Sequence, residues 1–535
     1  MSRVLLRGGR IYTKPATVAT AMHCVDGSIT WIGSDVDAVR YLDQSDEVID
    51  LEGSLVTPAF VDAHVHTTAA GLALTGLDLT ETTSLGQMLD ALERYCRRER
   101  GHRVLGHGWD ETRWPDARPP TRHELDRASY GGFVYLTRID VHSAVASSAL
   151  LAALPDIRTV EGYSESGLLH REAHHLARAA ALRTIPAAQR DAAQRATLDR
   201  AAHLGIGALH ELGGPDISGA DDFKSVLAVA ASGAFPDVVG YWGQLGGQTD
   251  AEGDAAAAQD VAPEGVRAAQ ALGARGAAGD LFADGALGSH TACLRAAYAD
   301  EPHRGVGYLT ADQVRDHVVA CTRAGIQAGF HVIGDGALDS VIDGFTMASQ
   351  RVGAKAIRSA RHRLEHVEMV DDRHLRALAD LGIVASVQPA FDALWGGDAG
   401  MYVTRLGHTR AATMNPFASM QAAGVVLAFG SDAPVTPLDP WAGVRAAVMH
   451  QTERERIDTE SAFAAHTSGG WKAAGVDDQG VLAPGRPATY AVWSAPESVE
   501  TTTGLPDLRE GAPAPTCQRT VVAGQTIFAG EEALR

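Results

Sequence analysis

The sequence is poor in lysine and cysteine and has no long apolar run. Its 535 residues include four lysines and five cysteines, and no two cysteines form a CxxC pair. A disulfide framework and a cysteine-based zinc site are therefore not expected, whereas a reducing compartment fits this usage. No segment approaches the ~18–20 apolar residues of a membrane span, and the N-terminus lacks a signal-peptide pattern. We expect a cytoplasmic protein.

Basic residues are also in the minority. The chain has 46 Lys and Arg against 66 Asp and Glu, which gives a formal net charge of -20. Nucleic acids and anionic membranes bind basic surfaces, so this balance argues against both as main partners. Hydrophobic residues make up 45% of the chain, which is typical of a globular protein. The sequence therefore predicts a large globular protein that binds neither nucleic acid nor membrane.

Both ends of the chain alternate apolar and polar residues between glycines. Examples are HCVDGSITWIGS near the start and CQRTVVAGQTIFAG near the end. A period of two residues with intervening turn residues predicts short β-strands. We expect one small β-sandwich domain made of residues 1–56 and 476–535, which brings the two termini together.

Eight short apolar runs, most of them followed by a helical pattern, occupy the middle of the chain. Alternating strands and helices with near-continuous apolar strands predict a parallel sheet covered by helices, and eight such units predict a (β/α)8 TIM barrel over residues 57–475. The predicted strands lie within residues 56–66, 205–214, 238–247, 279–289, 326–335, 361–370, 383–391 and 425–435.

A long insertion, residues 67–204, separates the first predicted barrel strand from the second. It is far longer than a crossover requires and has strand-like and helical pieces of its own. One interpretation is an insertion without a role in the site. The other is a cap over the barrel mouth, which we favour because barrel active sites lie at the carboxyl ends of the strands.

Histidine and aspartate residues recur at the ends of these predicted strands. His64 and His66 form an HxH pair at the end of the first, and His331, His366 and Asp432 lie on or after the fifth, sixth and eighth. Each alone has an ordinary alternative, such as a buried core histidine or an aspartate that caps a loop. Together they supply the imidazole and carboxylate ligands that suit zinc, iron, manganese or nickel.

An ordered set of motifs carries a specific resemblance. VTPAFVDAHVH, FHVIGD, RLEH and GSDAPV, in this order, resemble the amidohydrolase superfamily, in the branch of N-substituted formamide deformylase-like metal-dependent hydrolases. The resemblance implies a divalent metal, zinc first, held by His64, His66, His331, His366 and Asp432. It also implies that Asp432 takes a proton from metal-bound water as this water attacks the C–N bond of an amide, N-formyl, N-acyl or carbamate group in a small molecule. A homodimer is a further expectation from the family.

One position departs from the pattern. Many relatives carry a carboxylated lysine that bridges two metals, in a segment that resembles VKIFADG, whereas this chain has GDLFADG with Asp280 in its place. No lysine lies in any of the predicted strands. Asp280 either bridges two metals itself or orients a ligand or a water beside a single metal. One or two metals per chain therefore remain open.

Further positions match the resemblance in the region expected to contact substrate: Trp109, Asp110, Arg138, His142, Asp284, His290 and Gln388. For Arg138, a salt bridge that holds the insertion together is an equal alternative. Three other functions also remain open. A ring deaminase is disfavoured because no glutamate follows His331 in His331-Val-Ile-Gly-Asp335. An ester or lactone hydrolase would use the same activated water, and a barrel that binds metal without turnover would explain the missing lysine.

Overall fold

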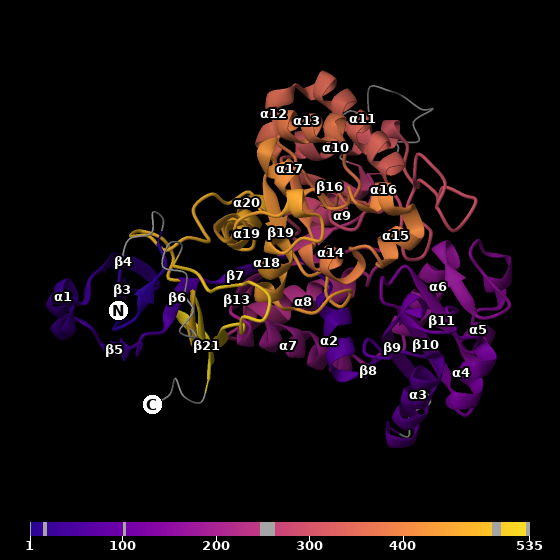
Figure 1. The fold of residues 1–535 in the computed structure, drawn as a ribbon, viewed down its shortest axis with the longest axis horizontal. Coiled ribbons are helices and arrows are strands. Elements are labelled where there is room, and N and C mark those ends of the chain that lie inside the picture. Colours follow the sequence, from indigo (N-terminus) through magenta and orange to yellow (C-terminus); the bar gives the residue numbers. More distant parts are fainter. Residues whose placement is uncertain (1, 14–18, 100–102, 247–262, 495–503, 531–535) are drawn as a thin grey trace.

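The computed structural model describes residues 2–13, 19–99, 103–246, 263–494 and 504–530. Its centre is an eight-stranded parallel sheet in which strands adjacent along the chain are paired in space (Figure 1). The strands are β7 (Phe60–Val65), β13 (Ile206–Gly213), β14 (Asp237–Trp242), β15 (Gly276–Ala277), β16 (Gln327–Val332), β17 (Arg363–His366), β18 (Val384–Val387) and β19 (Leu427–Phe429).

Backbone hydrogen bonds bring the first and last strands of this sheet together. The Asp432 amide donates to the carbonyl of His64 at 2.7 Å, and the His66 amide donates to the carbonyl of Ala433 at 3.0 Å. Every residue of β7 and β13 is buried, as expected where helices cover one face of a sheet and side chains fill the other. The predicted TIM barrel is confirmed.

The predicted fourth strand was placed wrongly. The prediction placed this strand within residues 279–289. The observed strand, β15, is only two residues long and ends at Ala277, before that range begins. Gly279 follows with φ +93°, a conformation that glycine adopts easily and that interrupts the strand. Phe282 then pairs again with His331 through an isolated bridge. Asp280 therefore lies in an irregular stretch at the carboxyl end of β15.

Helices on the outside of the barrel begin and end with recognisable caps. In α10 (Ala311–Ala324), Thr310 and Gln313 form a capping box, and Gly325 ends the helix in the left-handed conformation. Its apolar face buries Val314 and Val318. The remaining barrel helices are α8 (Ala220–Ala231), α9 (Glu264–Ala271), α11 (Asp335–Val352), α12 (Ala354–Ala360), α13 (Asp372–Leu381), α14 (Pro389–Trp395), α15 (Met401–Leu406), α16 (His408–Ala411), α17 (Phe417–Ala422), α18 (Pro440–Val448), α19 (Thr459–Ala465) and α20 (Ser468–Ala473).

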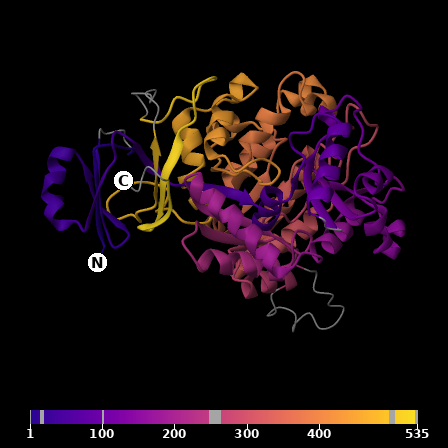
Figure 2. The ribbon, with the colours of Figure 1, turned by 90° about the horizontal axis from the view of Figure 1, so that it is seen from below.

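Strands from both ends of the chain form two further sheets. One contains β4 (Ser28–Gly33), β3 (Ala21–Val25), β1 (Arg3–Arg7) and β5 (Glu47–Asp50), and α1 (Asp35–Ala38) lies beside it. The other combines β2 (Arg10–Ile11) and β6 (Leu55–Pro58) with β20 (Tyr490–Ser494), β21 (Thr516–Val522) and β22 (Gln525–Ala529). A shared core that includes Leu6, Met22 and Tyr490 joins the two sheets. Figure 2 shows them together at one end of the molecule.

The chain between β7 and β13 builds a sheet of its own, which lies beside the barrel (Figure 1). Its strands are β8 (Leu77–Asp78), β9 (Arg103–Trp109), β10 (Phe133–Arg138), β11 (Ser143–Ala146) and β12 (Leu168–His170). The helices are α2 (Thr67–Thr75), α3 (Leu85–Glu99), α4 (Arg122–Ala128), α5 (Ser148–Ala152), α6 (Arg171–Leu182) and α7 (Ala187–His203). Among the helices in the described ranges, none is long and apolar enough to cross a bilayer.

Candidate metal centre

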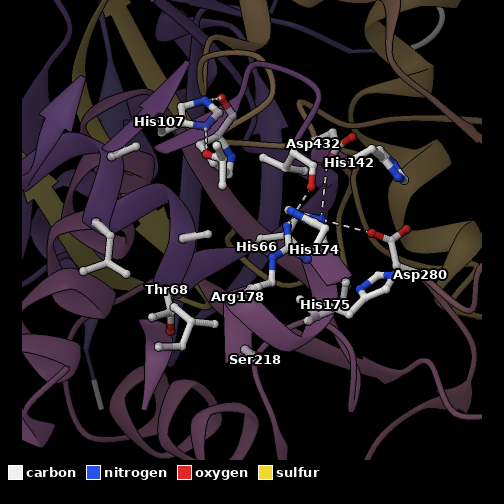
Figure 3. Close-up of a pocket in the computed structure, with 18 of the residues that line it drawn as sticks. His66, Thr68, His107, His142, His174, His175, Arg178, Ser218, Asp280 and Asp432 are labelled. Atoms are coloured by element: carbon white, nitrogen blue, oxygen red, sulfur yellow. Dashed lines mark hydrogen bonds and ion pairs between the residues drawn. The ribbon is translucent and has the colours of Figure 1, made fainter. Parts of the chain in front are cut away.

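Six side chains meet where the barrel strands end at their carboxyl termini. They come from five strands or the residues just after them, and each is at most 6% exposed: His64, His66, Asp280, His331, His366 and Asp432. Figure 3 shows His66, Asp280 and Asp432 with their side chains turned toward one another. The barrel topology therefore gathers into one cluster all six positions that the sequence suggested as ligands.

The distances within this cluster suit a bound cation. Nε2 of His64 lies 3.5 Å from Asp280 Oδ1 and 3.3 Å from Asp432 Oδ1. Nε2 of His66 lies 3.1 Å from Asp280 Oδ2, and Nδ1 of His331 lies 3.6 Å from Asp280 Oδ1. Two tetrahedral ligands at ~2.1 Å from a zinc ion are about 3.4 Å apart. The side chains are thus spaced as ligands of a shared ion.

Several of the cluster's polar atoms are buried without a hydrogen bond from any described residue: His64 Nε2, His331 Nδ1, His366 Nε2, Asp280 Oδ1 and Asp432 Oδ1. Leaving a buried polar group unpaired costs about 1–3 kcal/mol, so five such atoms in one place require a common partner. Three sets of three side chains have ligand atoms close enough to share an ion, and Asp280 belongs to two of them. The residues present fit a divalent metal.

Backbone conformation helps to aim two of these side chains. His366 and Asp432 have φ angles of +70° and +57°, in the left-handed region that residues other than glycine seldom adopt. Such conformations cost about 1–3 kcal/mol each and cluster at functional sites. At the ends of β17 and β19 they turn the strands, so that both side chains face the cluster.

A buried ion pair between Glu365 and Arg363 orients the imidazole of His64. Nδ1 of His64 donates to Glu365 Oε2 at 3.0 Å, and Glu365 is bound by two nitrogens of Arg363 at 2.6 and 2.9 Å. Burial alone would raise the pKa of Glu365, but Arg363 and His64 outweigh it and lower this pKa to about 2. Because the carboxylate only accepts, Nδ1 of His64 carries the proton and the Nε2 lone pair faces the cluster.

Two other histidines are oriented in the same way. Nδ1 of His66 donates to the carbonyl of Leu212 at 2.9 Å. Nδ1 of His366 donates to Gln388 Oε1, also at 2.9 Å. Each bond leaves Nε2 free to act as a ligand. Gln388, expected at the substrate, therefore lies against a histidine of the cluster.

The charge state of the cluster also suits a cation. Burial would raise the pKa of Asp432, but the neighbouring imidazoles of His64, His66 and His366 hold it below its usual value. The carboxylate is therefore ionised at neutral pH. Burial would lower the pKa of His66, but hydrogen bonds to Asp280 and Asp432 raise it to about 9, so a metal bound there would displace a proton from this imidazole.

A cavity of about 110 Å³ opens beside the cluster. His66, Asp280, His331, His366 and Asp432 form one part of its wall. The insertion supplies much of the rest, through His107, Tyr135, Thr137, His142, His174, His175 and Arg178. This shared lining is what the cap interpretation of the insertion requires.

Among the positions of the insertion expected to contact substrate, His142 lies beside the metal cluster and lines the cavity. Its ring centroid is 5.0 Å from that of His331. Burial, followed by the neighbouring His331, lowers the pKa of His142 to about 3. Its imidazole is therefore uncharged at neutral pH and offers a hydrogen bond without a charge.

Arg138 takes part in a buried ionic network. Its guanidinium binds Asp110, Glu111 and Asp140, each at 2.9 Å. This is the arrangement expected if a salt bridge between Arg138 and Asp140 holds the insertion together. Trp109 packs in the apolar core of the insertion, and its indole N–H donates to the carbonyl of Leu136 at 2.9 Å.

Asp284 and His290 do not belong to the cavity lining. The carboxylate of Asp284 accepts the backbone N–H groups of Cys293, Ile333 and Gly334 at 2.8–3.0 Å. His290 pairs with Asp300 at 3.0 Å. Asp284 thus fastens the segment after β15 to the segment after β16.

Replacing Asp284 by asparagine should destabilise the fold without harming the chemistry. The amide has one acceptor oxygen and would present its NH2 group to backbone donors, which costs roughly 1–3 kcal/mol. We expect a lower midpoint in denaturant unfolding and an unchanged kcat/KM per bound metal. A selective rise in KM with unchanged stability would instead support the predicted contact with substrate.

Three of the four lysines lie on helices outside the barrel strands. Lys224, Lys355 and Lys472 are on helices α8, α12 and α20, and Lys14 lies outside the described residues. Among the described residues, no lysine lines the cavity beside the cluster. Asp280 takes the place in the cluster that the family pattern gives to the carboxylated lysine.

A TIM barrel with a His/Asp cluster of this kind is typical of metal-dependent hydrolases. One solved structure similar to this chain is that of a metal-dependent hydrolase from Pyrococcus furiosus. The two match with a TM-score of 0.69 and 25% sequence identity, over 92% of this chain and 98% of the hydrolase. The chain belongs to the amidohydrolase family, whose family model matches residues 47–528. The protein is therefore an amidohydrolase, an enzyme that hydrolyses carbon–nitrogen bonds other than peptide bonds.

Two further relatives place the chain within this family. It is 28% identical to YtcJ of Bacillus subtilis over 488 residues, which are 85% of each chain. It is 26% identical to the N-substituted formamide deformylase of Arthrobacter pascens over 451 residues, which are 81% of each chain. The resemblance read from the sequence motifs is confirmed.

Proposed function

We propose that this amidohydrolase cleaves an amide, N-formyl, N-acyl or carbamate bond of a small molecule at the six-residue cluster. Zinc is the proposed metal, and manganese, iron and nickel suit the same ligands. The observation that carries the proposal is the set of five buried ligand atoms that receive no hydrogen bond from the described residues and lie together at the mouth of the barrel. The similarity to a formamide deformylase supports the choice of an amide-type bond.

A divalent cation held there supplies Lewis acidity, which polarises a carbonyl and makes water nucleophilic near neutral pH. The protein's own part begins with Asp432, which we propose as the general base. Its Oδ1 faces His64 and His66 at 3.3 Å, while Oδ2 is turned away from them, 4.0 Å from His366 Nδ1. Oδ2 therefore remains as the atom that accepts a proton and passes it to the leaving nitrogen.

His142 and the wall of the insertion position the substrate in this proposal. The uncharged imidazole of His142, beside His331, donates or accepts a hydrogen bond at the scissile group. His107, whose Nε2 donates to the carbonyl of Pro434 at 2.8 Å, ties the insertion to the loop that carries Asp432. The insertion thereby keeps bulk water from the reacting atoms.

We propose that Asp280 binds metal directly rather than orienting a ligand from outside the cluster. Its Oδ2 faces His66 at 3.1 Å, and its Oδ1 faces His331 at 3.6 Å and His366 at 3.8 Å. Six donor side chains exceed the four of a tetrahedral zinc site. These side chains would hold one or two ions per chain, which would supply the Lewis acidity described above.

Removal and return of metal tests this function. Chelator treatment should abolish hydrolysis of a panel of N-formyl, N-acyl and carbamate compounds, and added zinc should restore it. Elemental analysis should find one or two metals per chain in the wild type and fewer in Asp280→Asn. Unchanged metal content in Asp280→Asn would remove Asp280 from the ligands. Full metal content without turnover of any compound would leave a barrel that binds metal without catalysis.

A further inference from the structure

Two arginines of the insertion, Arg171 and Arg178, line the cavity beside the metal cluster, and Arg178 is the one without an ionic partner among the described residues. Arg178 lies on α6, three and four residues after His175 and His174, so the three side chains share one helix face. Figure 3 shows all three among the side chains that line the cavity. The guanidinium donates to the carbonyls of Val141 at 3.1 Å and Asp216 at 3.4 Å. These bonds hold it in place but do not neutralise its charge.

The cavity's carboxylates are engaged elsewhere. Asp280 and Asp432 belong to the metal cluster. Glu211 accepts the backbone N–H of Thr67 at 2.8 Å, and Asp222 accepts the hydroxyl of Thr68 at 2.9 Å and lies 3.6 Å from Arg190. Within the described chain, Arg178 forms no ion pair. The second arginine on the lining, Arg171, is already paired with Glu161.

Uncharged groups surround Arg178 instead. Burial lowers the pKa of His107 to about 4 and that of His142 to about 3, and the positive charge of Arg178 contributes to both shifts. Burial also lowers the pKa of His174 and His175, and Arg178 is the second cause in each case. The charge of Arg178 is thus felt around the whole cavity, where an anion would be stabilised.

The charge of Arg178 and the apolar residues of the cavity lining together indicate which kind of ligand would bind. One uncompensated cation matches one negative charge, which favours a carboxylate over a doubly charged phosphate. The guanidinium is a planar fork that suits carboxylate geometry. The cavity lining also includes Leu72, Leu105, Leu182, Ile217 and Phe282, which favour an apolar body.

We propose that the substrate is an N-acyl compound whose larger part is apolar and ends in a carboxylate, and that Arg178 is the residue that recognises this carboxylate. The inference rests on the proposed function, because the acyl–nitrogen bond must reach the metal cluster. Phe282 and His175 connect the metal cluster to the helix that carries Arg178. The ring centroids of His331 and Phe282 are 4.9 Å apart, and those of Phe282 and His175 are 5.9 Å apart. A single amino-acid-sized molecule spans such a path.

Calorimetric binding to the metal-loaded protein tests the proposal with two matched probes. N-acetylphenylalanine and N-acetylphenylalaninol carry the same amide and differ only in carboxylate against hydroxymethyl. We expect the wild type to bind the carboxylate about tenfold more tightly. The ratio should fall to about one in Arg178→Gln. It should stay as in the wild type in the control Arg171→Gln, which removes a lining arginine that is already paired.

A preference that persists in Arg178→Gln would overturn the proposal, because the metal would then be binding the carboxylate. So would the absence of a preference in the wild type. Circular dichroism shows whether Arg178→Gln folds; if it does not, Arg178→Lys, which keeps the charge, should retain the preference and Arg178→Met should lose it. Turnover of both probes is measured in parallel. Preference without turnover supports the carboxylate site, and the panel of N-formyl, N-acyl and carbamate compounds then decides the proposed function. Turnover without preference supports the proposed function and overturns the carboxylate site.

Discussion

Replacing Glu365 by glutamine should weaken metal binding about 10–100-fold and destabilise the fold by roughly 3–5 kcal/mol. The first effect follows from His64, whose Nδ1 donates to Glu365 Oε2 at 3.0 Å. A glutamine can turn its NH2 group toward this nitrogen and stabilise the tautomer that has its proton on Nε2. That proton would occupy the position where the metal should bind.

The second effect follows from Arg363, which is fully buried. Its remaining partners are neutral: His210 Nδ1 at 2.9 Å, the carbonyl of Ala63 at 2.7 Å and the hydroxyl of Ser386 at 2.9 Å. Without the carboxylate of Glu365, the guanidinium would be a buried charge without a counter-ion. Removal of one partner of a buried ion pair is costly for this reason.

Metal titration and denaturant unfolding separate these effects. The double variant Arg363→Met/Glu365→Leu removes both charges and should recover much of the stability but not the metal affinity. Asp477→Asn breaks the exposed pair with Arg361 and serves as the control, with no measurable change in either quantity. A Glu365→Gln protein with wild-type metal affinity would show that Glu365 does not orient His64.

The barrel could be predicted because parallel strands leave a simple signal. β7 and β13 are buried on both faces, so they appear as apolar runs, and a histidine at the end of such a run is placed near the barrel mouth. The fourth strand does not leave this signal. With two residues in β15 and a left-handed Gly279, its position depends on contacts with neighbouring strands rather than on its own pattern.

The support of His64 by Glu365 could not be predicted because the two residues are distant in sequence. His64 and Glu365 are 301 residues apart and meet only when the barrel closes. A charged pair such as Arg363 and Glu365 within a buried strand did carry a usable signal, since it must be neutralised locally. Arg178 had no such signal, because its role depends on which face of α6 turns toward the barrel.

Motif matches also left side-chain direction open. Asp284 and His290 follow the fourth strand closely, as contacts with substrate would, yet Asp284 turns to backbone N–H groups and His290 turns to Asp300. His142 comes from a similar match and does line the cavity. Proximity along the chain fixes the region of a residue, and only the packing around it decides where its side chain points.

Asp432→Asn should lower kcat by about 10²–10⁴-fold while the protein keeps metal. The amide cannot accept a proton at neutral pH, so the step assigned to Oδ2 is lost. The other five donors still surround the cation space, and His64, His66 and Asp280 alone form one of the close ligand sets. The loss should therefore appear in turnover per bound metal and not mainly in metal content.

The measurement is kcat on an N-acyl substrate, normalised to metal determined by elemental analysis on the same sample. Asp439→Asn is the matched control, because Asp439 lies on the same loop after β19 and caps α18 through the N–H of Ala442 at 3.0 Å. Asparagine caps a helix equally well, so its kcat should equal that of the wild type. An Asp432→Asn enzyme that turns over at more than about a tenth of the wild-type rate per metal would contradict the role of Asp432, because a general base is worth more than this factor. The proton would then have to go to another group that faces the cavity, and His142 is the nearest neutral imidazole beside His331.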